Sequence, residues 1–139
     1  MVQLVLGRKG KGKTKHLLHK VNDEIQKVSG NIVYLDKSTK HMYELNNKIR
    51  LIDVSDYMVT CCDEFVGFIC GIISQDHDLE QMYFDSFLKI ACIEDGSIED
   101  VVNKLELISE KFKIDFILSV CLDESEVSDT MKSKVMISL

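Results

Sequence analysis

The sequence predicts a single α/β domain, a three-layer α/β/α arrangement in which helices cover both faces of a mainly parallel sheet. Short apolar runs alternate with amphipathic segments along the chain, and this alternation is typical of right-handed β-α-β units. The chain has 139 residues, of which 45% are hydrophobic, and that is enough for one core around a sheet. No tract resembles a linker or a repeat, so we expect one domain over residues 1–139.

Apolar periodicity and turn residues define the elements of the first half. Apolar residues recur at helical spacing through 17–28, and Gly30 supplies a stop. Residues 31–36 are rich in β-formers and end in an acid. In order, we expect a strand at 2–6, a helix at 13–28, a strand at 31–36, a short helix within 37–48 and a strand at 49–54.

The second half continues the alternation. Residues 115–121 are almost continuously apolar, as in a buried central strand. Ser97 and Asp100 resemble a capping box for the amphipathic helix that follows, and the spacing of Gly67 and Gly71 favours close packing of their helix on the sheet. In order, we expect a helix at 63–74, a strand at 80–85, a helix from 97 to 112, a strand at 115–121, a weak helix at 124–131 and a strand at 134–139.

The charge balance and the cysteines limit the class of protein. The net charge of −6 and a pI near 5.2 argue against constitutive nucleic-acid binding, which needs a basic face. The longest apolar run, 65–73, is too short to span a bilayer, and no signal peptide precedes the first expected strand. We therefore expect a cytoplasmic protein with no membrane partner. Its five cysteines should be reduced, with Cys70, Cys92 and Cys121 as small core residues.

One stretch carries a recognisable chemistry. Residues 7–14 match the phosphate-binding P-loop pattern G-x-x-x-x-G-K-[ST], which ordinary residue frequencies produce by chance in about 0.5% of chains of this length. The glycines let backbone N–H groups surround an anion, Lys13 supplies positive charge for the outer phosphates, and the Thr14 hydroxyl can coordinate Mg²⁺. A Gly/Lys-rich surface turn is the alternative. The predicted nucleotide-binding residues are Gly7, Arg8, Lys9, Gly10, Lys11, Gly12, Lys13 and Thr14.

Other polar residues are expected to meet this loop. Ligands of parallel sheets bind at the carboxyl ends of strands, where the loop, Asp36, Asp85 and residues 119–123 all fall. Mg²⁺ prefers oxygen ligands, and Asp85 ends an apolar run in the manner of a Walker-B aspartate. We expect Thr14 and Asp85 to hold the metal. The alternative role for Asp85 is to cap the next helix.

On these residues the chain resembles the P-loop NTPase superfamily. The order of the strand at 31–36, a helical stretch and the later Asp85-Ser86 pair resembles its RecA-like branch. The resemblance implies a P-loop NTPase fold with bound ATP and Mg²⁺, although only residues 7–14 are specific. The chain is also similar to small bacterial proteins described as twitching-motility ATPases, but it lacks the acidic and histidine boxes of the much larger pilus-retraction motors.

Two departures from that family concern turnover. RecA-like ATPases position the attacking water with a glutamate, and this chain has Ser38 and Ser86 at the two positions, neither of which can act as a carboxylate base. Asp36 is the nearest substitute and joins Lys13 as a catalytic candidate, while its alternative role is to cap the following helix. The chain also has only two arginines, which argues against a kinase with an arginine-bearing lid.

The sequence thus supports two functions. The first is a Mg-dependent ATPase that is slow alone or depends on an unidentified protein partner. The second is a nucleotide-responsive adapter that acts through a partner without turnover. A degenerate loop that binds only phosphate or sulfate is a third interpretation.

Overall fold

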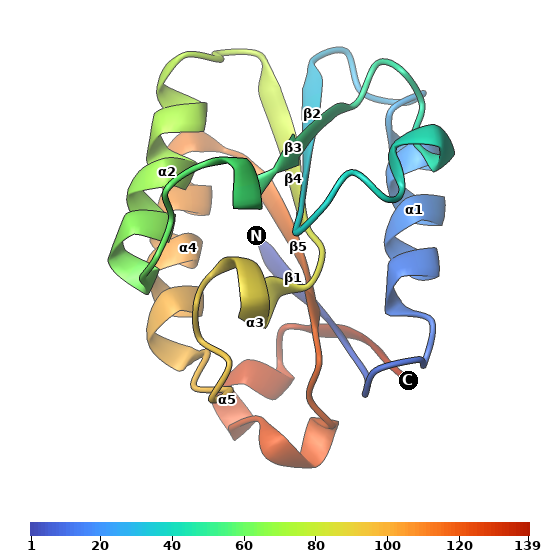
Figure 1. Cartoon of the computed structure of the whole chain (residues 1–139). Coiled ribbons are helices and arrows are strands. Elements are labelled where there is room, and N and C mark those ends of the chain that lie inside the picture. Colours follow the sequence, from blue (N-terminus) through green and yellow to red (C-terminus); the bar gives the residue numbers. More distant parts are fainter.

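The computed structural model describes all 139 residues and contains one six-stranded sheet (Figure 1). The strands are β1 (Val2–Leu6), β2 (Asn31–Asp36), β3 (Arg50–Asp53), β4 (Leu79–Phe84), β5 (Asp115–Val120) and β6 (Val135–Ser138). Their order across the sheet is β3-β2-β4-β5-β1-β6, and every neighbouring pair is parallel. The predicted α/β class is confirmed, with a sheet that is entirely parallel.

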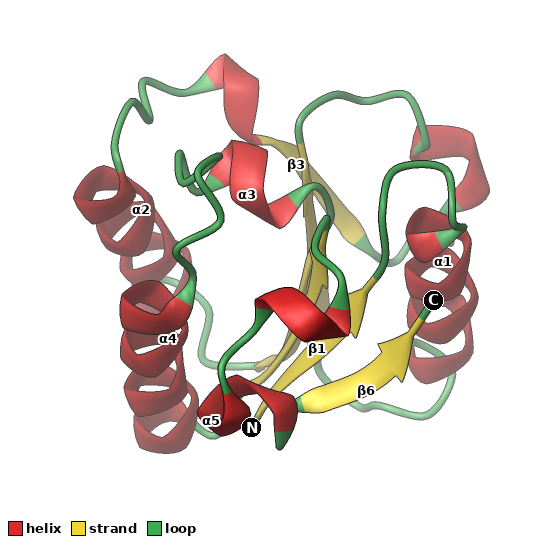
Figure 2. Cartoon of the chain, turned by 90° about the horizontal axis from the view of Figure 1, so that it is seen from below, coloured by secondary structure: helices red, strands yellow, loops and turns green.

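Helices cover the sheet unequally. The helix α1 (Lys13–Glu24) lies alone on one face, while α2 (Cys62–Ser74) and α4 (Glu99–Phe112) lie together on the other (Figure 2). These layers agree with the predicted α/β/α arrangement. None of the helices combines the length and the apolar character that crossing a membrane requires. The shorter elements are α3 (Phe87–Ile90), α5 (Asp129–Lys132) and the 3₁₀ turns η1 (Met42–Glu44), η2 (Val54–Asp56) and η3 (Glu124–Glu126).

Side chains alternate along the strands, so each face of the sheet has its own core. On the α1 face, Tyr34 and Tyr83 are fully buried and their rings stack with centroids 6.2 Å apart. On the other face, Phe84 is the centre of an aromatic cluster. Its ring meets three neighbours edge to face, at centroid distances of 5.5 to 6.0 Å: Phe65, Phe87 and Phe116.

Several elements are shorter than their sequence patterns indicated. The helix α1 stops at Glu24, and residues 25–27 continue as turns. Within 37–48 only η1 forms, and 124–131 divides into η3 and α5. The sequence did not predict α3, since four residues are too few to display a helical period.

The predicted capping box is wrong. The helix α4 begins at Glu99, and its N-cap Ile98 makes no side-chain cap hydrogen bond. Ser97 is used in a local turn, because its N–H and hydroxyl both donate to Asp95 Oδ1, at 3.1 and 2.8 Å. Because Ser97 bonds to Asp95, its hydroxyl does not cap α4.

The predicted packing of small residues is also wrong. Gly67 and Gly71 lie on the exposed side of α2, where an added methyl group would meet no atom within 4 Å. The prediction that Cys70, Cys92 and Cys121 are core residues is wrong as well, because Cys70 and Cys92 are exposed and Cys121 is half-buried. The helix α2 contacts the core through residues four apart, which turns the intervening positions outward. These core residues are Phe65, Ile69 and Ile73.

Phe84→Ala should destabilise the protein by about 3 to 5 kcal/mol, because it removes the centre of the aromatic cluster and leaves a cavity. Phe112→Ala is the matched control, since Phe112 is 46% exposed at the end of α4, and it should cost less than about 1 kcal/mol. Urea unfolding of the two variants measures the difference, and equal losses would contradict the packing described here.

Candidate functional site

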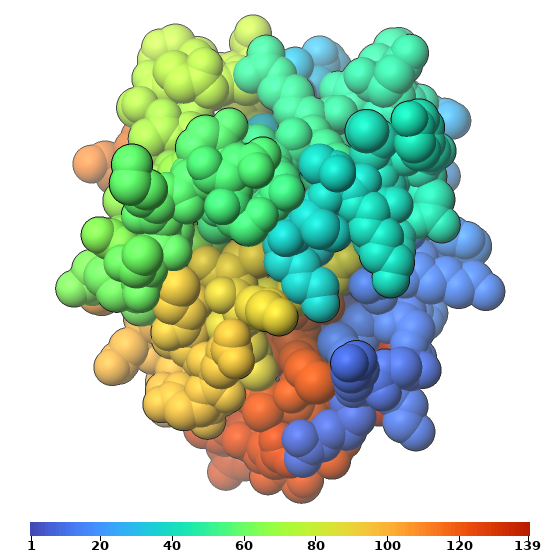
Figure 3. All heavy atoms as spheres, in the orientation of Figure 1, coloured from blue at the N-terminus to red at the C-terminus, as the bar shows by residue number.

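A cavity of about 730 Å³ opens at the carboxyl ends of the strands. Its walls come from the loop after β1, the segment after β2, α3 with the residues that follow it, and the end of β5. In Figure 3 these parts, in blue, cyan, yellow and orange, meet on one face of the molecule. The volume lies within the range of small-molecule sites, so the sheet places a ligand-sized cavity where the sequence predicted one.

The loop at 7–14 has the backbone that its glycines allow. Gly10 and Gly12 adopt φ of 85° and 93°, a left-handed conformation that residues with a Cβ rarely take. Gly12 is also the N-cap of α1, so the free N–H groups of the first helical turn face the cavity end of the helix. Lys13 Nζ donates to the carbonyl oxygen of Arg8 across the loop, at 3.2 Å. The loop is therefore shaped to surround an anion.

Asp85 is the polar centre of the site. It is 2% exposed and accepts three hydrogen bonds: from Thr14 Oγ1 to Oδ1 at 3.2 Å, from the Ser86 N–H to Oδ1 at 2.9 Å, and from the Tyr34 hydroxyl to Oδ2 at 2.9 Å. Burial and the neighbouring Asp85 raise the pKa of Tyr34 far above its usual value, which keeps the phenol protonated as a donor. The structure thus brings the two predicted metal ligands, Thr14 and Asp85, into contact.

Asp85 does not cap the following helix, which was its alternative role. The N-cap of α3 is Ser86, at φ 54°, and no side-chain hydrogen bond caps that helix. The carboxylate instead turns toward the loop and β2 through its bonds to Thr14 and Tyr34.

Asp36 lies beside Asp85, one strand further along the sheet. The strand register pairs Leu35 with Phe84, and the Asp85 N–H donates to the Leu35 carbonyl oxygen at 2.8 Å. Asp36 is 3% exposed and its Oδ1 accepts from the Lys37 N–H at 2.7 Å. Burial, and then the charge of Asp85, raise the pKa of Asp36 to about 6. A base with that pKa accepts a proton more readily than an ordinary aspartate. Asp36 itself does not line the cavity, however, and the neighbouring Lys37 does.

Asp36 does not cap a helix either. The next helical turn, η1, begins six residues later and has His41 at its N-cap. The carboxylate makes its one hydrogen bond to the adjacent Lys37 N–H.

The loop residues divide into two groups. Lys9, Gly10, Gly12, Lys13 and Thr14 line the cavity, whereas the other three loop residues do not. Those three residues are Gly7, Arg8 and Lys11.

Both arginines point away from the cavity. Arg8 is held outside it by Asp123, at 3.3 Å from Nε to Oδ2, and by Glu126. Arg50, at the start of β3, pairs with Asp76 at 3.6 Å. No arginine side chain therefore lines the cavity.

Several cavity residues were not singled out from the sequence. Lys37 and Lys40 follow a strand that ends in an acid, a position that could have drawn attention to them. Lys89 and Glu94 lie on or after the unexpected α3, so no pattern indicated them. Ser119, by contrast, belongs to the stretch 119–123 that the sequence placed at this edge of the sheet, and it is 1% exposed and lines the cavity at the end of β5.

Comparison with known proteins assigns no family to this site. No protein-family model matches the chain, and no curated protein matches it significantly.

Asp36→Asn should stabilise the protein increasingly as pH rises. The raised pKa of Asp36 means that the folded state binds this proton more tightly than the unfolded state does, so the wild type loses stability as pH rises from about 4 through about 6. Asparagine does not titrate and can still accept from the Lys37 N–H. Thermal melts at pH 4.5 and pH 7.5 should show a larger gain over wild type at pH 7.5, with the exposed Asp56→Asn as control. A gain that is equal at both pH values would contradict the burial of Asp36 beside the like charge of Asp85.

Tyr34→Phe should destabilise the protein by about 1 to 3 kcal/mol, because Asp85 Oδ2 then stays buried without its donor. Tyr83→Phe is the matched control, since the Tyr83 hydroxyl donates to the neutral Gln81 Oε1 at 2.8 Å, and it should cost about 1 kcal/mol. Urea unfolding at pH 7 compares the two. A Tyr34→Phe loss no larger than the Tyr83→Phe loss would show that the bond to Asp85 has no special weight.

Proposed function

We propose that this protein binds a Mg-nucleoside triphosphate, ATP in the first instance, through its P-loop, and hydrolyses it slowly or only with a protein partner. The observation that carries the proposal is the contact between Thr14 Oγ1 and Asp85 Oδ1 at 3.2 Å. These residues are 71 positions apart, and both line the ligand-sized cavity. On this basis we also propose that the fold is that of a P-loop NTPase.

The donor set suits magnesium. Thr14 and Asp85 offer oxygen ligands only, and Mg²⁺ typically takes one or two protein ligands and completes its shell with water and phosphate. No cluster of three His, Cys, Asp or Glu side chains that could hold a metal is present, so an ion here would depend on the nucleotide for further ligands. When bound, Mg²⁺ would neutralise charge on the phosphate oxygens.

The loop suits the phosphates. Neither the Gly10 nor the Gly12 N–H donates to a backbone carbonyl, so both remain free to bind an anion in the manner of a nest. Lys13 lines the cavity, and its present acceptor, the Arg8 carbonyl oxygen, is one that a phosphate oxygen could replace. The amides, the lysine and the metal pair would together bind the outer phosphates.

The cavity holds fewer of the residues that hydrolysis needs than of those that nucleotide binding needs. Ser38 accepts a hydrogen bond from the Lys40 N–H at 3.3 Å and so stabilises a local turn. Ser86 lines the cavity but has a hydroxyl group in place of a carboxylate. The carboxylates that could activate water are Asp36, behind the wall, and Glu94, on it. Without an arginine in the cavity, charge that develops on the phosphoryl group lacks a usual stabiliser. These features favour slow hydrolysis or hydrolysis completed by a partner.

The same features favour a second candidate, an adapter that binds the nucleotide without turnover. Such a protein would respond to the γ-phosphate by ordering the segments around it. It must then bind ATP and ADP with different affinity, because a ligand shifts an equilibrium only through differential binding. Calorimetry with the two nucleotides separates this candidate from a simple nucleotide binder, and equal affinities would exclude the switch.

Lys13→Ala should abolish the stabilisation by Mg-ATP. At a ligand concentration of about 100 times Kd, binding stabilises a fold by about 2.7 kcal/mol, and the wild type should show this as a rise in melting temperature. Lys132→Ala, on the exposed side of α5, removes the same charge and should retain the full rise. The measurement is a thermal-shift panel of ATP, ADP, GTP and dTTP with Mg²⁺. An equal rise in wild type and Lys13→Ala would refute nucleotide binding at the loop.

A further inference from the structure

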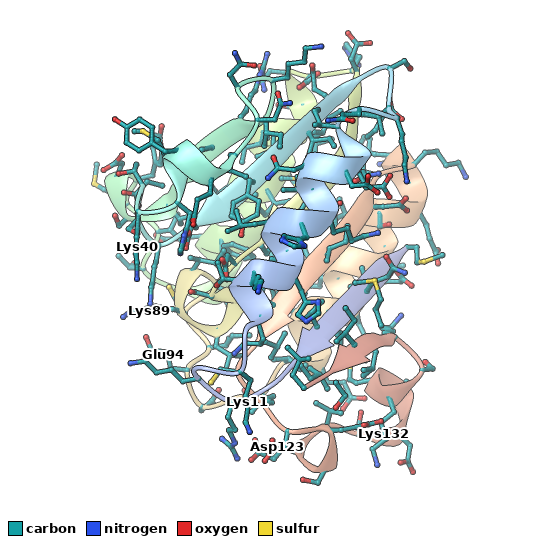
Figure 4. All side chains as sticks on the ribbon, turned by 90° about the vertical axis from the view of Figure 1, so that its right-hand side faces the viewer. Lys11, Lys40, Lys89, Glu94, Asp123 and Lys132 are labelled. Carbon is teal, nitrogen blue, oxygen red and sulfur yellow. The ribbon has the colours of Figure 1, made fainter.

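The cavity wall opposite the P-loop carries a second group of cations. Lys37 and Lys40 come from the segment after β2, and Lys89 comes from α3. We refer to Lys37, Lys40 and Lys89 as the lysine wall. Figure 4 shows Lys40, Lys89 and Glu94 in succession along one edge of the molecule, with Lys11 of the loop beyond them.

The lysine wall has no carboxylate partner. None of its three ammonium groups forms a salt bridge, and neither Lys9 nor Lys13 does. Five unpaired lysines and only two carboxylates line this cavity, in a protein whose net charge is −6. Such a concentration of one charge raises the local concentration of an anionic ligand.

The cations exceed what one Mg-nucleotide needs. Lys13, the loop amides and the pair Thr14 and Asp85 would hold a Mg-triphosphate on the loop side, where the metal would supply part of the positive charge that the phosphates need. Of the 16 lining residues only three are hydrophobic, and five are lysines. The remaining space and charge suit a compact anion.

We propose that the lysine wall binds a second phosphate group, carried by a small molecule, beside the Mg-nucleotide. This inference rests on the proposed function, because it places the second phosphate in the part of the cavity that the nucleotide leaves free. Glu94 limits the affinity, since its carboxylate lies on the same cavity wall and repels an anion.

The test is a titration with inorganic phosphate, with a non-hydrolysable β,γ-imido analogue of ATP and excess Mg²⁺ present so that the γ-phosphate position is filled. Amide chemical shifts report binding residue by residue in a protein of this size. We expect saturable shifts at Lys37, Lys40 and Lys89, at least a five-fold weaker Kd in the K40Q/K89Q double variant, and a tighter Kd in E94Q. K48Q/K132Q removes two exposed lysines elsewhere and should leave the Kd unchanged.

Two results would overturn the inference. If phosphate binds with Mg-ADP but not with the analogue, the lysine wall contacts the γ-phosphate of the nucleotide itself. If K48Q/K132Q weakens phosphate binding as much as K40Q/K89Q does, only the overall charge matters.

Failure of the proposed function gives a different pattern. If no nucleotide binds, the same titration on the free protein decides the question. Phosphate binding that depends on Lys40 and Lys89 more than on Lys13 supports the lysine wall alone. Phosphate binding that depends on Lys13 more than on Lys40 and Lys89 refutes it.

Discussion

The buried carboxylate of Asp85 is the group on which the arrangement of this molecule's cavity depends. Removing a charged group from water is costly unless donors replace the water, and three donors do so here, from α1, β2 and the turn into α3. Because these segments are far apart in the sequence, their hydrogen bonds to one carboxylate fix the loop relative to the sheet. The position of Thr14 therefore depends on Tyr34, which bonds to the other oxygen of the same carboxylate.

The parallel sheet explains why so many polar groups gather at one edge. Each strand ends at the same side, so Asp36, Asp85, Ser119 and the loop are brought together by topology. This arrangement has a cost, since burial, and then repulsion by the neighbouring Asp85 carboxylate, raise the pKa of Asp36. The cavity beside them is lined with unpaired lysines, and a bound cation between loop and sheet would reduce the same repulsion. The two carboxylates thus have hydrogen-bond donors but no cation, and the cavity lysines have no salt-bridge partner.

The sequence predicted the parts of this structure that local patterns encode. The strands were predicted to within one or two residues. The loop and Asp85 were predicted as site residues because their residue types suit a Mg-phosphate site and both follow expected strands. Features that depend on tertiary contacts were missed. In the sequence Tyr34 is an ordinary β-former, and only the structure shows that its hydroxyl donates to Asp85. In the sequence Arg8 belongs to a basic loop, and only the structure shows its ion pairs with Asp123 and Glu126. Gly67 and Gly71 suggested close packing, but which side of a helix meets the sheet depends on its larger apolar residues.

The distribution of charge supports the proposal of nucleotide binding more strongly than that of nucleotide hydrolysis. Binding needs donors and cations that are present before the ligand arrives, and the free loop amides, Lys13 and the lysine wall meet that need. Turnover needs groups placed where charge develops during the reaction. Asp36 lies behind Lys37 and Arg8 is held outside the cavity, so of the residues considered for this role only Glu94 lies on the cavity wall. Arg8 is tied to exposed acids through its own side chain, so the one arginine of the loop stays outside the cavity for as long as its ion pairs with Asp123 and Glu126 hold.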